Sequence, residues 1–108
     1  MNSTIQTPQR AAFSRLVLSK LSLGIKHEER FEDLSSDILN NVSNQLVLLE
    51  DHNQRKHKLN ALMDEIEEAR LIRRFHMMYE SPGHNKQLNA ALNFLSDQLK
   101  LRFSKYFS

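Results

Sequence analysis

The sequence contains no cysteine and no tryptophan. Without cysteine the chain can form no disulfide, no thiolate metal site and no cysteine nucleophile. Small secreted domains commonly need disulfides for stability, so we expect a cytoplasmic location. No run of apolar residues approaches the length of about 20 residues that spans a bilayer, so we expect no integral membrane segment.

Glycine and proline are almost as scarce. The chain has two of each, at Pro8, Gly24, Pro82 and Gly83, and residues 25–81 contain neither. These residues interrupt regular structure most strongly, and the remaining composition is rich in Leu, Glu, Lys, Arg, Gln and Asn. The sequence therefore predicts an all-α protein.

We expect one helical domain over residues 1–108, with a loose polar tail at 1–6. Thr7-Pro8 is a favourable helix start, because Thr caps first-turn amides and Pro fits the first helical position. Gly24 is expected to end the first helix in a left-handed conformation, and Pro82-Gly83 to form a turn. The predicted helices lie at about 8–23, 27–49, 54–80 and 85–107.

Residues 50–58 are nine consecutive residues without an apolar side chain. We favour a turn near residues 50–53, which gives an antiparallel four-helix bundle. The alternative is that 50–58 is exposed helix. The chain would then form one helix over about 26–80, giving three helices with a long helical hairpin, or a coiled-coil dimer.

The net charge is only +2, but it is unevenly distributed. Residues 1–26 carry four basic residues and no acidic one, whereas 27–53 carry seven acidic residues against Arg30 alone. Such alternation favours attraction between neighbouring helices. The acid-free, amphipathic character of 1–26 is also typical of a mitochondrial targeting segment, which is a minor alternative for the location.

Catalytic and metal-binding patterns are weak. Two glycines cannot build a glycine-rich phosphate loop, and the paired carboxylates fall on predicted polar faces. Only His76 and Glu80 have the helical spacing that places two metal ligands on one face. We interpret the histidines as surface residues and His84 as a turn residue. We expect no catalytic residue, no metal, no cofactor and no enzymatic activity.

Two basic clusters define a nucleic-acid-binding alternative. Phosphate-binding surfaces need clustered Lys and Arg, and such a protein would act as an accessory or regulatory factor. A simpler interpretation is a solvated face in which Glu67 pairs with the arginine three residues later. The residues of this alternative are Arg55, Lys56, Lys58, Arg70, Arg73 and Arg74.

The function that we favour depends on a surplus of apolar residues. The third and fourth helices carry more of them than one line of contact between packed helices would bury. The third helix becomes apolar nearly all round at its end, and the fourth has a second apolar face. Such surfaces bind partners, although a central helix buried on both faces is an equal explanation. We predict a protein–protein interaction module (regulatory, adaptor or chaperone-type) that forms homo-oligomers or hetero-complexes. The predicted partner-binding residues are Leu71, Ile72, Phe75, Met78, Tyr79, Phe94 and Leu101.

Overall fold

A computed structural model describes residues 12–76 and 82–107, without the side chains of 72–76 and 82. The predicted tail at 1–6 and the helix start at Thr7-Pro8 lie outside the described residues. Every regular element in the described part is helical, which confirms the all-α prediction. The elements are α2 (Ala12–Lys26), α3 (Phe31–Val47), α4 (His52–His76), α5 (Pro82–Arg102) and the short 3₁₀ helix η1 (Ser104–Tyr106).

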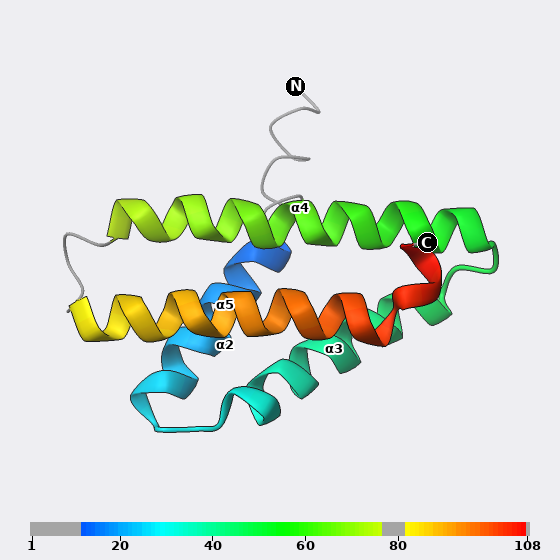
Figure 1. Cartoon of the computed structure of the whole chain (residues 1–108). Coiled ribbons are helices and arrows are strands. Elements are labelled where there is room, and N and C mark those ends of the chain that lie inside the picture. Colours follow the sequence, from blue (N-terminus) through cyan, green and yellow to red (C-terminus); the bar gives the residue numbers. More distant parts are fainter. Residues whose placement is uncertain (1–11, 77–81, 108) are drawn as a thin grey trace.

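The two longest helices, α4 and α5, lie side by side and run in opposite directions (Figure 1). Helices α2 and α3 meet at a tight connection and lie obliquely against this pair (Figure 1). Helix α2 contacts the other three helices, while α3 packs mainly on α5. None of the described helices combines the length and the apolar character that crossing a membrane requires.

The buried apolar side chains form one cluster between the four helices. They recur every three or four residues, as a helix with one inward face requires. The largest apolar side chains that are almost fully buried are Val17, Leu21, Leu34, Ile38, Val42, Leu59, Leu62, Ile66, Leu92, Leu95 and Leu99.

The connection between α2 and α3 differs from the expected glycine cap. Helix α2 continues through Gly24, which is buried and has no positive φ, and ends at Lys26. The left-handed residue is Glu28, at φ 58°. The Glu29 amide donates to the Gly24 carbonyl at 2.9 Å and the Glu28 amide to the Ile25 carbonyl at 3.1 Å, the two hydrogen bonds of a Schellman motif. Residues 27–30 are therefore a connection and not the start of the second helix, because this motif turns the chain away from the α2 axis.

The helix break that we expected within residues 25–81, the stretch without glycine or proline, is present. Helix α3 ends at Val47 and α4 begins at His52, so the single helix over about 26–80 is wrong. The polar residues after 52 form the exposed first turns of α4, with the Arg55 amide donating to the Asp51 carbonyl at 3.1 Å. Polar residues 50–58 thus provide both a turn and an exposed helix start.

Helix α5 differs from the prediction at both ends. It begins at Pro82 and not near residue 85, because proline's fixed φ and missing N–H suit the first helical position. It ends at Arg102 and not at residue 107. The tighter η1 turn follows, and it allows both Phe103 and Tyr106 to be buried.

Candidate functional site

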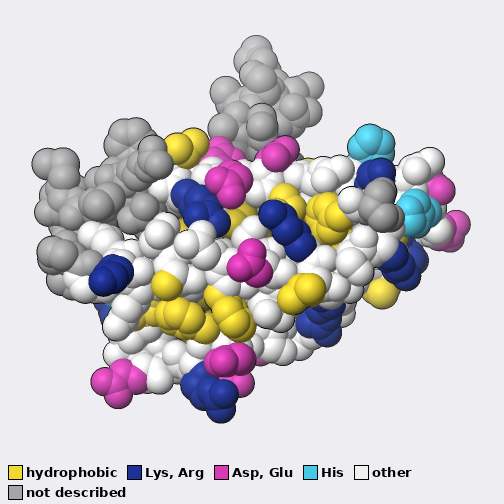
Figure 2. All heavy atoms as spheres, viewed as in Figure 1, with side chains coloured by type: hydrophobic (Ala, Val, Ile, Leu, Met, Phe, Trp, Pro, Cys, Tyr) yellow, Lys and Arg dark blue, Asp and Glu magenta, His cyan; other side chains and the backbone are white. Residues whose placement is uncertain are grey.

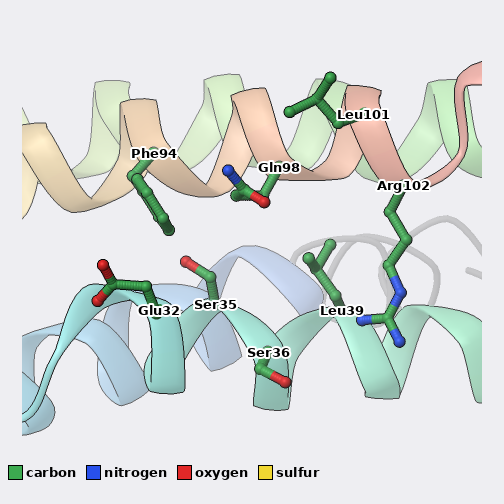
Figure 3. A pocket seen from close by; sticks show the side chains of 8 residues that line it. All are labelled: Glu32, Ser35, Ser36, Leu39, Phe94, Gln98, Leu101 and Arg102. Atoms are coloured by element: carbon green, nitrogen blue, oxygen red, sulfur yellow. The ribbon is translucent and has the colours of Figure 1, made fainter.

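A groove of about 380 Å³ opens between α3 and α5 (Figure 3). The two helices supply its walls because both carry residues just outside their buried stripes at this position. Its lining residues are Glu32, Ser35, Ser36 and Leu39 from α3, and Phe94, Gln98, Leu101 and Arg102 from α5.

The wall and rim of the groove are partly apolar. Phe94 is half-buried, and its ring centroid lies 6.4 Å from that of Phe31, so an aromatic pair closes one end. Leu39 is buried on the opposite wall, whereas Leu101 is 69% exposed at the rim. Exposed leucine beside a groove is apolar area that a partner can still remove from water.

The hydroxyl of Ser35 lies at the base of the groove. Ser35 is only 2% exposed, and its Oγ has no hydrogen-bond partner in the described part of the chain. Its side chain extends from α3 toward α5 (Figure 3). Burying a hydroxyl without a partner costs free energy, so a ligand group that bonds to Ser35 would gain affinity.

The two ends of the groove carry opposite charges. Glu32 lies at one end and Arg102 at the other (Figure 3). The Arg102 Nη2 donates to Asn40 Oδ1 at 3.2 Å, which joins α5 to α3. Glu32 faces Arg30 at 3.5 Å, with both side chains mostly exposed. The charges at both ends remain accessible to a partner.

The molecular surface also carries apolar side chains next to charged ones in this region. Hydrophobic side chains gather along the junction of α5 with α2 and α3, with acidic and basic side chains beside them (Figure 2). These apolar side chains are exposed on that face of the molecule.

The structure brings together two of the predicted partner-binding residues. Phe94 and Leu101 line the same groove, but Leu71 lies on α4 in a separate hollow among four carboxylates. The side chains of Ile72 and Phe75, and residues Met78 and Tyr79, lie outside the described residues.

The residues of the nucleic-acid alternative do not form one patch where they are described. Arg55 turns inward, Lys56 is exposed, and Lys58 lines a hollow with Glu65. Arg70 Nε lies 3.1 Å from Glu67 Oε1, as an ion pair without hydrogen-bond geometry, which confirms the expected pairing. The side chains of Arg73 and Arg74 lie outside the described part.

Sequence reasoning missed the α3 side of the groove. Ser35 and Leu39 are four residues apart and lie beside the buried stripe of α3, so they line a wall next to the core. The available signal was the Ile38-Leu39 pair, which widens the apolar face of α3 beyond one stripe. The small Ser35 gave no signal, because its burial depends on the packing of α5.

Two of the described histidines, His84 and His52, contact side chains of other elements. His84 is expected from the sequence in a loop turn, but it is a helical residue near the start of α5. Its Nε2 is 3.0 Å from Ser22 Oγ of α2. The His52 ring lies 4.9 Å from that of Tyr106. No group of three or more His, Asp or Glu residues among residues 12–76 and 82–107 is placed to hold a metal ion.

Comparisons with protein-family models, with curated proteins and with solved structures each find no match to this chain. The chemistry of the groove therefore rests on its own residues: a partly apolar wall, one buried hydroxyl that has no partner among the described residues, and opposite charges at the two ends.

Proposed function

We propose that the protein is a protein–protein interaction module whose α3–α5 groove binds a second copy of the chain. The observation that carries the proposal is the groove itself, in which exposed Leu101 stands beside an apolar wall and the buried Ser35 hydroxyl has no partner in the described part. Covering it removes apolar surface from water and allows a new hydrogen bond.

The charge pattern favours a second copy over an unrelated partner. A two-fold axis through the groove would set Glu32 of each copy opposite Arg102 of the other, because the two charges lie at opposite ends. Each copy would also offer Leu101 as a projecting side chain and the groove as its receptor. A two-fold interface requires this kind of self-complementarity.

The biological role follows from the assembly. A cytoplasmic regulatory, adaptor or chaperone-type protein suits a small helical scaffold that offers a paired binding face. In this proposal α2 and α3 complete an antiparallel four-helix bundle with α4 and α5, and the bundle holds the two walls of the groove at a fixed separation.

Light scattering over a wide concentration range tests the proposal. We expect a concentration-dependent dimer, and we expect Leu101→Glu to weaken it at least about tenfold, because a carboxylate would be desolvated in the interface. Leu101 is mostly exposed, so the variant should keep its fold. Leu71→Glu is the matched control, since Leu71 is also exposed but lies on α4 away from the groove.

A charge exchange tests the two-fold geometry. Glu32→Arg alone or Arg102→Glu alone should weaken the dimer, because each places like charges opposite one another. The double variant restores opposite charges in a two-fold dimer and should recover most of the affinity. Thermal unfolding of each variant separates this effect from loss of the Arg102–Asn40 hydrogen bond. A strict monomer, or a double variant as weak as the single ones, would overturn the proposal.

A further inference from the structure

A second cavity, of about 280 Å³, lies beyond the Arg102 end of the groove. Helices α3, α4 and α5 and the η1 turn line it and leave it open to solvent, so segments distant in the sequence meet there. Its lining residues are Ser43, Leu46, Val47, Arg55, Arg102, Phe103, Lys105 and Tyr106.

Three of these residues are cationic: Arg55 from α4, Arg102 from α5 and Lys105 from η1. None of the described lining residues is acidic. Three like charges around one cavity repel each other, and the repulsion grows as water is displaced. An anion with more than one negative charge would relieve it.

Two hydrogen bonds orient Arg55. Arg55 Nε donates to the Leu49 carbonyl at 2.8 Å, and its Nη1 donates to the Tyr106 hydroxyl at 3.4 Å. Lys105 Nζ lies 5.1 Å from the centre of the Tyr106 ring. The hydrogen bond from Arg55, helped by the charge of Lys105, lowers the pKa of Tyr106, as a positive potential in the cavity requires.

Three of the other lining residues are fully apolar. Phe103 and Leu46 are buried, while Val47 is 69% exposed at the mouth. Ser43 adds one hydroxyl that can donate to an oxyanion. The cavity therefore combines a buried apolar base with cationic side chains, of which Arg102 and Lys105 are exposed at its rim.

We propose that this cavity binds a phosphate monoester dianion carried on a small apolar or aromatic body. Arginine suits this group because its planar fork matches phosphate oxygens, and lysine adds a point charge. A dianion balances more of the three positive charges than a carboxylate does. The ester body would lie against Phe103 and Val47. This site is separate from the dimer groove, with Arg102 as their one shared lining residue.

Titration of the full chain with phenyl phosphate, followed by amide NMR, tests the proposal. We expect saturable shifts at Ser43, Val47 and Tyr106, and weaker binding as salt increases. Benzoate, with the same ring and one charge fewer, should bind at least about tenfold more weakly, since a charge-assisted hydrogen bond of ordinary strength is lost.

Matched variants assign the residues. Lys105 lines this cavity and not the α3–α5 groove. Lys105→Gln should therefore weaken phenyl phosphate binding about tenfold. Lys100→Gln removes the same charge from an exposed position on α5 and should leave binding unchanged. Because Lys105→Gln leaves the groove intact, the dimer should persist, and the two proposals can fail independently.

A second arm distinguishes the source of the phosphate. A short phosphoserine peptide that binds more tightly than phenyl phosphate would indicate a phosphorylated protein, and the reverse order a small phosphate ester. Three results would overturn the proposal. They are no saturable binding of either probe, equal affinity in Lys105→Gln, and binding of a single-stranded oligonucleotide at these residues without binding of the monoester.

Discussion

Leu34 of α3 packs directly against Gly24 of α2, at a point where α2 has no side chain. A Cβ placed on Gly24 would contact Leu34 Cδ2 closely and would lie 2.7 Å from its Cδ1. Leu34 is 1% exposed and has little room to move. Glycine is therefore needed here for close helix packing and not for a left-handed backbone.

Gly24→Ala should destabilise the protein by about 1–2 kcal/mol, although alanine favours helix more than glycine does. The clash with buried Leu34 outweighs the gain in helix propensity of about 1 kcal/mol. Urea unfolding followed by circular dichroism measures the difference. An equal or more stable variant would show that Leu34 can move aside at no cost.

Gly83→Ala is the control for that substitution. A Cβ at Gly83 meets nothing within 4 Å, and the residue lies in the first turn of α5. We expect a gain of up to about 1 kcal/mol from helix propensity alone. Opposite signs for the two Gly→Ala variants in the same unfolding assay would confirm that packing, not backbone conformation, decides the effect at residue 24.

Glu28→Gly should raise the free energy of unfolding by about 0.5–1 kcal/mol. Glu28 has φ 58°, a conformation that costs most residues energy but not glycine. Some of this gain is offset because glycine has more freedom in the unfolded chain. Glu29→Gly, next in the same connection but without a positive φ, should not stabilise. Chemical denaturation of both variants provides the comparison.

Glu65→Gln should change stability in a pH-dependent way. Burial raises the pKa of Glu65 above 4.5, against the opposing effect of the Ser14 and Phe13 amides at the start of α2. A raised pKa means that the folded state binds the proton more tightly than the unfolded state does. The contribution of Glu65 to folding stability is therefore greatest below its pKa in the unfolded chain. It decreases as the pH rises from about 4.5 through the folded pKa.

The stability of Glu65→Gln relative to the native protein should therefore be more favourable at about pH 7 than at about pH 4. Denaturant unfolding at both pH values measures this difference. Asp64→Asn, an exposed neighbour on α4, is the control and should show no comparable change. A relative stability of Glu65→Gln that is the same at both values would contradict the raised pKa.

Tyr106 should ionise below its ordinary pKa of 10, because Arg55 donates to its hydroxyl and Lys105 lies close by. Ultraviolet difference titration in a Tyr79→Phe background follows this single phenol. Arg55→Gln should move the pKa back toward the ordinary value, whereas Lys56→Gln, at an exposed position, should not. Any stability from this pair is present above pH 10 and is lost as the pH falls through the folded pKa.

The helical content and much of the core followed from the sequence. Leu88, Leu92, Leu95 and Leu99 recur in the sequence at the three- and four-residue spacing of one helix face, and all four are buried. The polar stretch at 50–58 correctly marked the break between α3 and α4. Periodicity of this kind is a local property, since it depends only on which residues share one face of one helix.

Contacts between helices could not be predicted in this way. Leu16 and Leu23 look like core residues of α2, yet they are 41% and 57% exposed, because α2 turns Gly24 and Ser14 inward instead. Which face of α2 is buried depends on Leu34 of α3, because Leu34 needs the space left by Gly24. A single sequence does not record which residue on another helix fills that space.

By itself, the sequence determined an all-helical chain without thiol chemistry and the position of its central break. Only the tertiary structure decided where the grooves and charge clusters of the surface lie. It assigned Gly24 to packing and not to capping, and it brought Phe94 and Leu101 to one groove with Ser35. It also gathered Arg55, Arg102 and Lys105 around one cavity. The reason is physical: helix periodicity acts within a few residues, whereas grooves and charge clusters arise between helices that are distant in the chain.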